Sequence, residues 1–246
     1  DMRFFGNEEQ VLMVITSDGS IAYWSFDDRN YSVKITYHEY GDSFGIAIHP
    51  SEPIWYFVER EGDLLVVDEG TNQIIERISW LDEEAYGIHV SPTENVVAVV
   101  TNNGTFGLWE IGAEQGQSVE TYVEYLTRVN ITNDGRLALT DAPSEVRVWD
   151  IITGETILLI DDYRSVEIPR ISPDGSLIAG FVEGDMVFWD VATGDEIHRA
   201  STDFPYITML EFSPDGTTLA FGTEYDGPMV LWGISALGYD EITLNN

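Results

Sequence analysis

A short segment recurs six times along this chain at nearly constant spacing, centred on tryptophan in five copies and on Val67 in the other. The copies are SIAYWSF at 20–26, DLLVVDE at 63–69, TFGLWEI at 105–111, EVRVWDI at 145–151, DMVFWDV at 185–191 and PMVLWGI at 228–234. Aligned on Trp24, Val67, Trp109, Trp149, Trp189 and Trp232, they are separated by steps of 43, 42, 40, 40 and 43 residues. A period of this length, carried by short β segments, is typical of a β-propeller, in which each repeat forms one blade.

Each repeat contains three further segments with β character. An apolar segment ends in a tight turn such as Pro173–Gly175 or Pro214–Gly216, where proline presets one dihedral angle and glycine supplies a positive φ. A second, almost continuously apolar segment follows, which is typical of a strand buried on both faces. The segment after the tryptophan strand is more polar, as in 73–79, 118–125, 155–160 and 195–200. The sequence therefore predicts an all-β propeller of four-stranded antiparallel blades, in which the more polar strand of each blade lies outermost.

Several of these motifs resemble a known family. Val148-Trp149-Asp150 followed by Thr153-Gly154-Glu155, the equivalent residues 188–190 and 193–195, and the Ser-Pro-Asp-Gly turns are similar to bacterial members of the WD-repeat family. The resemblance covers nearly the whole chain and implies a closed ring that serves as a platform for other macromolecules, usually without catalysis. The chain also departs from the family: only Trp149 and Trp189 are followed by aspartate, and the Gly-His pair that opens a typical repeat is missing. The family's buried set of His, Asp, Ser/Thr and Trp is therefore not carried over.

Six repeats are visible, and we expect them to form one domain over residues 1–246. Met2–Phe5 supplies a first inner strand and Glu241–Leu244 a last outer strand, which completes six blades. Rings of this family more often have seven blades, so a longer parent chain with a further repeat is the alternative. The start at Asp1 indicates a processed chain, an excised domain or omitted ends. No segment has the length and apolar character of a membrane span, and no signal peptide is visible, so we expect a soluble chain of unassigned compartment.

The charge balance is strongly acidic. Lys34 is the only lysine, and 11 basic residues face 44 carboxylates, which gives a formal net charge of −33. Such a field repels nucleic-acid phosphates and anionic lipid headgroups, because binding to both depends on Lys and Arg. We therefore exclude a nucleic-acid binder and direct membrane insertion. Either the acidity is a general property of the surface, as in a high-salt proteome, or it recruits a basic protein partner or divalent cations.

Acidic and aromatic residues gather on one predicted rim of the ring. The links from outer strand to next inner strand fall on this rim, together with the turns before the tryptophan strands. The residues that we expect to bind a partner there are Tyr40, Asp42, Trp80, Asp82, Glu83, Tyr86, Asp161, Asp162, Tyr163, Arg164, Phe204 and Tyr206. Tyrosine and tryptophan are common interface anchors, and carboxylates beside them steer and hold Lys or Arg. The alternative is that these aromatics only cover the sheet ends.

Catalytic motifs are missing from the sequence. There are no cysteines, and the four histidines fall in different repeats without a metal-binding pattern, so we predict no metal and no cofactor. His49 and His89 lie at the ends of inner strands, where a structural role is favoured. We therefore predict a noncatalytic protein–protein interaction scaffold, in the manner of a subunit of a larger assembly. The alternative is a propeller enzyme or carbohydrate-binding module with carboxylates at the central entrance, which requires raised carboxyl pKa values in a closed pocket.

Overall fold

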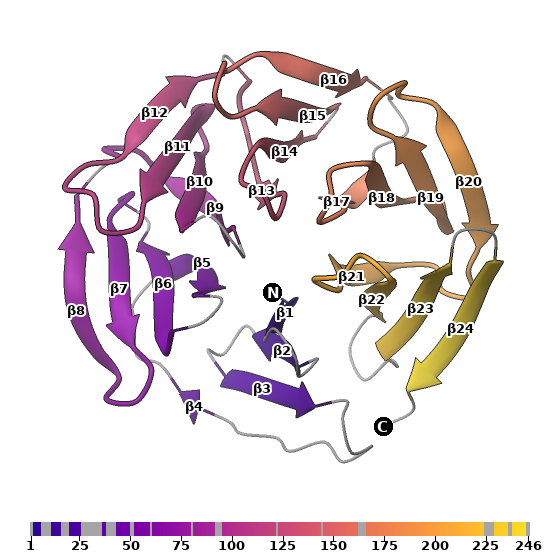
Figure 1. Ribbon diagram of the computed structural model, residues 1–246, viewed down its shortest axis with the longest axis horizontal. Helices are drawn as coiled ribbons and strands as arrows, with labels where there is room; N and C mark the ends of the chain where they lie inside the picture. The colour runs from indigo at the N-terminus through magenta and orange to yellow at the C-terminus, as the bar shows by residue number, and fades with distance from the viewer. Residues whose placement is uncertain are drawn as a thin grey trace.

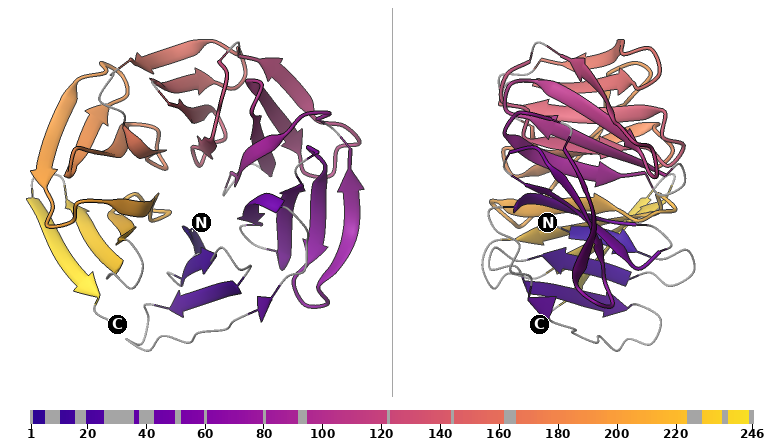
Figure 2. Two further views of the ribbon diagram at one scale, coloured as in Figure 1. Left: turned by 180° about the vertical axis from the view of Figure 1, so that it is seen from behind. Right: turned by 90° about the vertical axis from the view of Figure 1, so that its left-hand side faces the viewer.

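The strands are arranged as blades around a central axis, with their inner strands nearest that axis (Figure 1). This computed structural model describes residues 2–5, 11–15, 20–25, 36–37, 43–49, 52–59, 61–79, 81–91, 95–121, 123–143, 145–161, 166–223, 229–235 and 238–244. Side chains are described from residue 45 to residue 234, with the same gaps. Seen edge-on, the ring is a disc with connections on both of its faces (Figure 2).

The first three blades follow one another along the chain. The first contains β1 (Met2–Phe5), β2 (Val11–Ile15), β3 (Ser20–Ser25) and β4 (Thr36–Tyr37). The second contains β5 (Ser43–Ile48), β6 (Ile54–Glu59), β7 (Leu64–Asp68) and β8 (Gln73–Ile78). The third contains β9 (Ala85–Val90), β10 (Val96–Thr101), β11 (Thr105–Glu110) and β12 (Gln117–Glu120).

The later sheets repeat the same order. The fourth contains β13 (Arg128–Ile131), β14 (Leu137–Ala142), β15 (Glu145–Asp150) and β16 (Thr156–Ile160). The fifth contains β17 (Glu167–Ile171), β18 (Leu177–Val182), β19 (Asp185–Asp190) and β20 (Glu196–Ser201). The next contains β21 (Ile207–Phe212), β22 (Thr218–Thr223), β23 (Met229–Ser235) and β24 (Gly238–Leu244). The prediction of an all-β propeller with four-stranded antiparallel blades is confirmed.

The two ends of the chain build separate blades. β1 to β4 come from the first part of the chain and β21 to β24 from the last, so no described strand from one end completes a sheet begun at the other. β1 nevertheless lies beside β21, which brings the first and last blades together at the centre of the ring. Contacts between inner strands, rather than a shared sheet, therefore join the two ends.

The hydrophobic core lies between neighbouring blades. The second strands are almost completely buried, as in Val97–Val100, which are 0% exposed, and their apolar side chains point to both faces of the sheet. Aromatic contacts join adjacent blades: the rings of Tyr56 and Trp109 lie 6.1 Å apart, and those of Phe188 and Trp232 lie 6.4 Å apart. Burial of such apolar area, at about 25 cal/mol per Å², is the main force that holds blades face to face.

One predicted outer strand ends earlier than expected. The pattern at 118–125 predicted a strand that reaches Tyr125, but β12 ends at Glu120. The hydroxyl of Thr121 donates a hydrogen bond of 2.7 Å to the carbonyl of Gly104, and Tyr125 has a φ of 63°. The hydrogen bond of Thr121 back to the turn and the left-handed conformation of Tyr125 direct the chain away from β11, so residues 121 and 123–127 form a link. Among the described residues there is no helix, and hence none that could cross a membrane.

Candidate docking rim

One face of the ring carries two kinds of connection, and we call it the link face. It contains the links from outer to inner strands (81–84, 121, 123–127, 161, 166 and 202–206) and the turns between second and third strands (61–63, 102–104, 142–143 and 183–184). Backbone hydrogen bonds tie the two sets together. The N–H of Asn102 donates to the carbonyl of Glu84 at 2.9 Å, and that of Thr202 donates to the carbonyl of Gly184 at 3.3 Å. The predicted meeting of links and turns on one rim is therefore present.

Glycines let the links lie directly on the turns. A Cβ atom added to Gly104 would be 2.3 Å from the carbonyl oxygen of Val123, and one added to Gly62 would be 2.0 Å from that of Leu81. Both glycines also have positive φ values, 86° and 89°. Only glycine allows both the close approach of the link and the positive φ without strain. These two glycines therefore let the links pack against the turns.

Two tyrosines on the links are strongly exposed. Tyr125 and Tyr206 each expose 58% of their surface. Tyr206 was predicted as a contact residue, and Tyr125 follows the end of the shortened strand β12. Tyr86 is only half-buried and occupies an irregularity in β9, where the register with β10 shifts. Bulges of this kind redirect a side chain relative to its strand.

Phe204 packs inward rather than standing free on the rim. Its ring lies 5.9 Å from that of Phe221, nearly edge-on at 72°, and it borders the core cluster between the last two blades. This contact is what the alternative interpretation of the aromatics predicted, namely coverage of the sheet ends. Phe204 therefore supports the link that carries Tyr206.

The acidic residues on the link face also divide into two groups. Asp82 and Asp161 are exposed, whereas Glu83 is half-buried and accepts a hydrogen bond of 2.8 Å from the hydroxyl of Thr101. The sequence prediction of contact residues missed Glu124, which is exposed beside Tyr125, because that segment was interpreted as strand. The remaining predicted residues, Tyr40, Asp42, Trp80, Asp162, Tyr163 and Arg164, lie outside the described residues.

The described arginine side chains are all engaged in ion pairs. They are Arg77, Arg128, Arg136, Arg147, Arg170 and Arg199. On the link face, Arg128 lies 2.8 Å from the carboxylate of Asp141, whose side chain is 7% exposed. Whatever stability each pair contributes, the pairs neutralise the few positive charges of the described residues. The acidic excess of the described surface is therefore not offset by free arginines.

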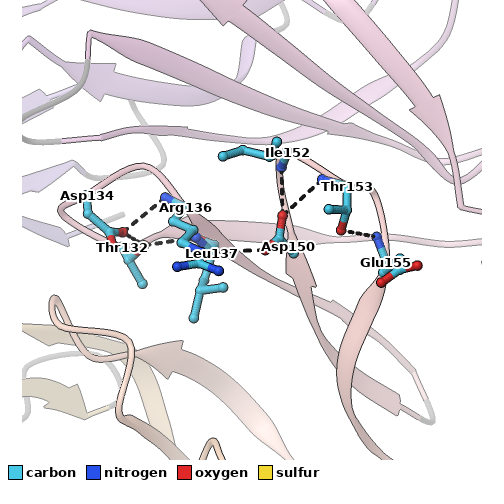
Figure 3. Close-up of polar contacts among 8 residues, drawn as sticks. All are labelled: Thr132, Asp134, Arg136, Leu137, Asp150, Ile152, Thr153 and Glu155. Atoms are coloured by element: carbon cyan, nitrogen blue, oxygen red, sulfur yellow. Dashed lines mark hydrogen bonds and ion pairs between the residues drawn. The ribbon is translucent and has the colours of Figure 1, made fainter.

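The opposite face consists of turns in which aspartates have structural roles, and we call it the turn face. Figure 3 shows this face of the fourth blade, where Asp150 accepts hydrogen bonds from the backbone of Ile152 at 3.0 Å and Thr153 at 2.9 Å. Arg136 lies 3.5 Å from the same carboxylate and donates its backbone N–H to Asp134 at 3.0 Å. The aspartate that follows the tryptophan thus closes the turn to the outer strand.

Hydrogen bonds hold these turn-face aspartates ionised. Burial raises the pKa of Asp174, but the hydrogen bonds that it accepts from Ser172 and Ser176 outweigh burial, so the pKa lies below its ordinary value of 3.8. The pKa of Asp215 is lowered in the same way, through Ser213 and Thr217. Their carboxylates therefore stabilise turns.

Near the axis, the turns of different blades are joined to one another. The backbone N–H of Asn133 donates to the carbonyl of Pro173 at 2.8 Å, and its side-chain amide donates to the carbonyl of Pro214 at 3.0 Å. Asn133 occupies the place that proline has in those two turns. Because proline has no N–H, only the asparagine can make the first of these bonds.

A buried polar belt joins the inner strands. His89, Asn130, Arg170 and Glu211 occupy the same register position in successive blades. Nδ2 of Asn130 lies 3.0 Å from Nε2 of His89, and its Oδ1 accepts the N–H of Ile171 at 3.0 Å. Nε of Arg170 lies 3.1 Å from Oε2 of Glu211. These contacts join the inner strands of four successive blades, so the four side chains have a structural role.

Metal chemistry finds no support in the described part of the chain. No group of three or more His, Asp or Glu side chains there is placed to hold an ion. Of the histidines, His49 is buried and its Nδ1 accepts the N–H of Glu52 at 2.9 Å, while burial lowers its pKa. Like His89, it serves the fold.

Comparison with known proteins agrees with this architecture. No family model matches the chain. It is 25% identical over 180 residues to Serine-threonine kinase receptor-associated protein of Dictyostelium discoideum, a match that covers 71% of this chain. It is 33% identical over 67 residues, or 27% of the chain, to Pre-rRNA-processing protein IPI3 of Mycosarcoma maydis. The four-stranded blades, the Trp-Asp repeats and these similarities are those of a WD-repeat β-propeller.

These relatives are longer than the matched region. The match covers 56% of the first and 11% of the second, so the chain spans about half the length of the one and about a tenth of the other. Both come from eukaryotes, and the bacterial type of the repeats stays a prediction.

Part of the family's buried hydrogen-bonded set is present, since Nε1 of Trp149 donates to the hydroxyl of Thr140 at 2.8 Å.

Proposed function

We propose that this chain is a noncatalytic scaffold that docks a basic protein partner on its link face, as a subunit of a larger assembly. The observation that carries the proposal is the pair of tyrosines, Tyr125 and Tyr206, each 58% exposed on links that hydrogen bonds hold to the ring. Tyrosine offers a large contact area at low entropic cost and is enriched among interface hot spots. A rigid support lowers the ordering cost of binding further.

Charge favours a basic partner. Each tyrosine shares its link with an exposed acid: Glu124 precedes Tyr125, and Asp203 lies on the link that carries Tyr206. Asp82 and Asp161 add exposed carboxylates on the same face. Because the described arginines are already paired, such a surface attracts Lys and Arg from a partner and accelerates their encounter.

The proposed contact set keeps the predicted residues and assigns them different roles. Asp82, Asp161 and Tyr206, with Tyr125 and Glu124 added, would touch the partner. Glu83 and Phe204 would position the links through Thr101 and Phe221. The other predicted residues remain proposed contact residues, namely Tyr40, Asp42, Trp80, Tyr86, Asp162, Tyr163 and Arg164.

The inner strands fit a noncatalytic role better than a catalytic one. Glu211 is a buried inner-strand carboxylate and is paired with Arg170 at 3.1 Å. The described carboxylates with a clear pKa shift, namely Asp68, Asp150, Asp174 and Asp215, are all shifted downward, whereas a catalytic acid needs an upward shift. The Dictyostelium relative is named for association with a kinase receptor, which also agrees with a binding role.

We also propose that residues 1–246 form one domain with a ring of six blades. The contact between β1 and β21 supports this arrangement. A longer parent chain with another repeat is the alternative, and it would place a further blade between these two.

Affinity capture with matched baits tests the docking proposal. The baits are the wild-type chain, a Tyr125→Ala/Tyr206→Ala variant and, as control, an Ile152→Ala/Ile197→Ala variant, whose positions are 82% and 53% exposed away from the link face. We expect the wild type and the control to capture the same basic protein in stoichiometric amount, and the tyrosine variant to lose it. Equal capture by all three baits would refute the docking proposal.

A further inference from the structure

The outer strand of the fourth blade is an unprotected sheet edge. β16 lies at the end of its sheet, and its sequence, Thr-Ile-Leu-Leu-Ile, contains neither a charge nor a proline. Ile157 and Leu159 are 47% and 44% exposed. Proteins normally protect such edges with charged residues, because an open edge can pair with another strand.

The equivalent strands of two other blades have that protection. Arg77 on β8 and Arg199 on β20 occupy the register position that Leu159 occupies on β16. Arg77 pairs with Glu59 and Asp63, the latter at 2.9 Å, and so places charge along its edge. β16 lacks this arginine.

In the fourth blade an arginine lies on the neighbouring inner strand, β15, instead of on the outer strand. Arg147 lies on β15, directly opposite Leu159, where it pairs with Glu145 at 2.6 Å and covers the ring of Trp149 at 5.6 Å. The side chains of β16 then divide by face. Leu158 and Ile160 pack against the core cluster between the fourth and fifth blades, whereas Ile157 and Leu159 point away from it.

The charges at the ends of β16 indicate what can pair with it. Glu155 and Asp161 flank the strand and are both exposed. A second copy paired antiparallel about Leu158 would bring Glu155 opposite Asp161 at both ends, and a parallel copy would bring like residues together. Both arrangements are repulsive, and the net charge of −33 adds to the repulsion.

We propose that β16 is a second docking site, which binds an extended peptide with an apolar centre and Lys or Arg at both ends by adding it as a fifth strand. Main-chain hydrogen bonds would supply affinity, Ile157 and Leu159 would select apolar side chains, and Glu155 and Asp161 would hold the basic ends. Asp161 lies where β16 meets the link face, so a partner bound there could continue onto that face. The site nevertheless stands independently of the link-face proposal.

Fluorescence anisotropy with a defined peptide tests this site. The probe is fluorescein-labelled KKTVIVTRK, titrated with the full 246-residue chain. We expect saturable binding, at least tenfold weaker for Leu159→Arg and for Ile157→Arg, and protection of residues 156–160 from hydrogen exchange. Ile197→Arg is the matched control. Ile197 occupies on β20 the bulge position that Ile157 occupies on β16, and it is 53% exposed. It should change affinity less than twofold.

Several results would overturn the proposal. One is the absence of saturable binding to the wild type, and another is equal peptide affinity of the wild type and Leu159→Arg. The proposal would also fail if Ile197→Arg lost as much affinity as Leu159→Arg, or if the acid-flanked peptide EETVIVTEE bound as tightly as the basic one. Dimerisation through β16 in sedimentation experiments would also refute it, since a hetero-partner is what the flanking charges favour. Unchanged peptide binding by Tyr125→Ala/Tyr206→Ala would separate this site from the link face.

Discussion

Individual carboxylates in this propeller have different roles on its two faces. On the turn face, Asp150 and Asp174 accept backbone and hydroxyl hydrogen bonds and close turns. On the link face, Asp82 and Asp161 are exposed. The total charge therefore overstates how many acids are available to a partner.

The turn-face aspartates should make part of the stability depend on pH. The folded-state pKa values of Asp174 and Asp215 lie below the ordinary value of 3.8, so their stabilisation is full above that pH and is lost as the pH falls through and below it. We expect Asp174→Ala to cost about 1 kcal/mol at pH 7 and clearly less at pH 3, measured by urea unfolding. Asp195→Ala is the control on the same face. An equal cost of Asp174→Ala at both pH values would show that the turn does not depend on the ionised carboxylate.

The buried pair in the inner belt should be sensitive to the loss of either partner. Arg170 and Glu211 are 6% and 7% exposed, so Arg170→Met leaves a buried carboxylate without this partner and should cost about 3–5 kcal/mol. Arg170→Met/Glu211→Leu should cost less than the single change, because both charges are then removed. Equilibrium unfolding of the wild type, Arg170→Met, Glu211→Leu and the double variant measures this coupling, and additive costs of the two single changes would argue against a coupled pair.

At the scale of elements, glycines in the turns determine where the links lie. Gly104 and Gly184 occupy equivalent turns and have similar φ values, 86° and 95°, but only at Gly104 would an added Cβ meet atoms of the link. Comparing the two therefore separates the cost of backbone strain from the cost of displacing the link.

Alanine at these two glycines should have unequal effects. Gly184→Ala should cost about 1 kcal/mol through its left-handed conformation alone, since no atom lies within 4 Å of the added Cβ. Gly104→Ala should cost about 3 kcal/mol, because overpacking adds to the left-handed strain where the Cβ would lie 2.3 Å from the carbonyl oxygen of Val123. Thermal or urea unfolding measures both, and equal costs would show that the link does not depend on this glycine.

Elements were predictable from the sequence where one periodicity dominates. The apolar second strands and the tryptophan strands lie where the repeat places them, because burial on both faces leaves a continuous apolar signal. The end of β12 was not predictable, because Thr121 and Tyr125 have a pattern that also suits a strand. Only the hydrogen bond to Gly104 and the positive φ of Tyr125 redirect the chain. The inward packing of Phe204 depends on contact with Phe221, which no local pattern encodes.

For the whole molecule, self-repulsion should limit stability. A net charge of −33 acts against the compact state, and the described arginines are already paired locally. Raising sodium chloride from about 0.05 M to 1 M shortens the Debye length from above 10 Å to about 3 Å, so we expect Tm to rise by several degrees. Calorimetry measures this directly, with the chain at constant pH. A fall in Tm would mean that attractive ion pairs outweigh the repulsion.

In our proposal the link face, and not the turn face, binds the partner. Hydrogen–deuterium exchange of the chain, alone and with its captured basic partner, tests it most directly. We expect slower exchange at 81–84, 121–127 and 202–206, with unchanged exchange in the turns at 132–136, 172–177 and 213–217. Protection confined to those turns, with unchanged exchange in the links, would contradict it.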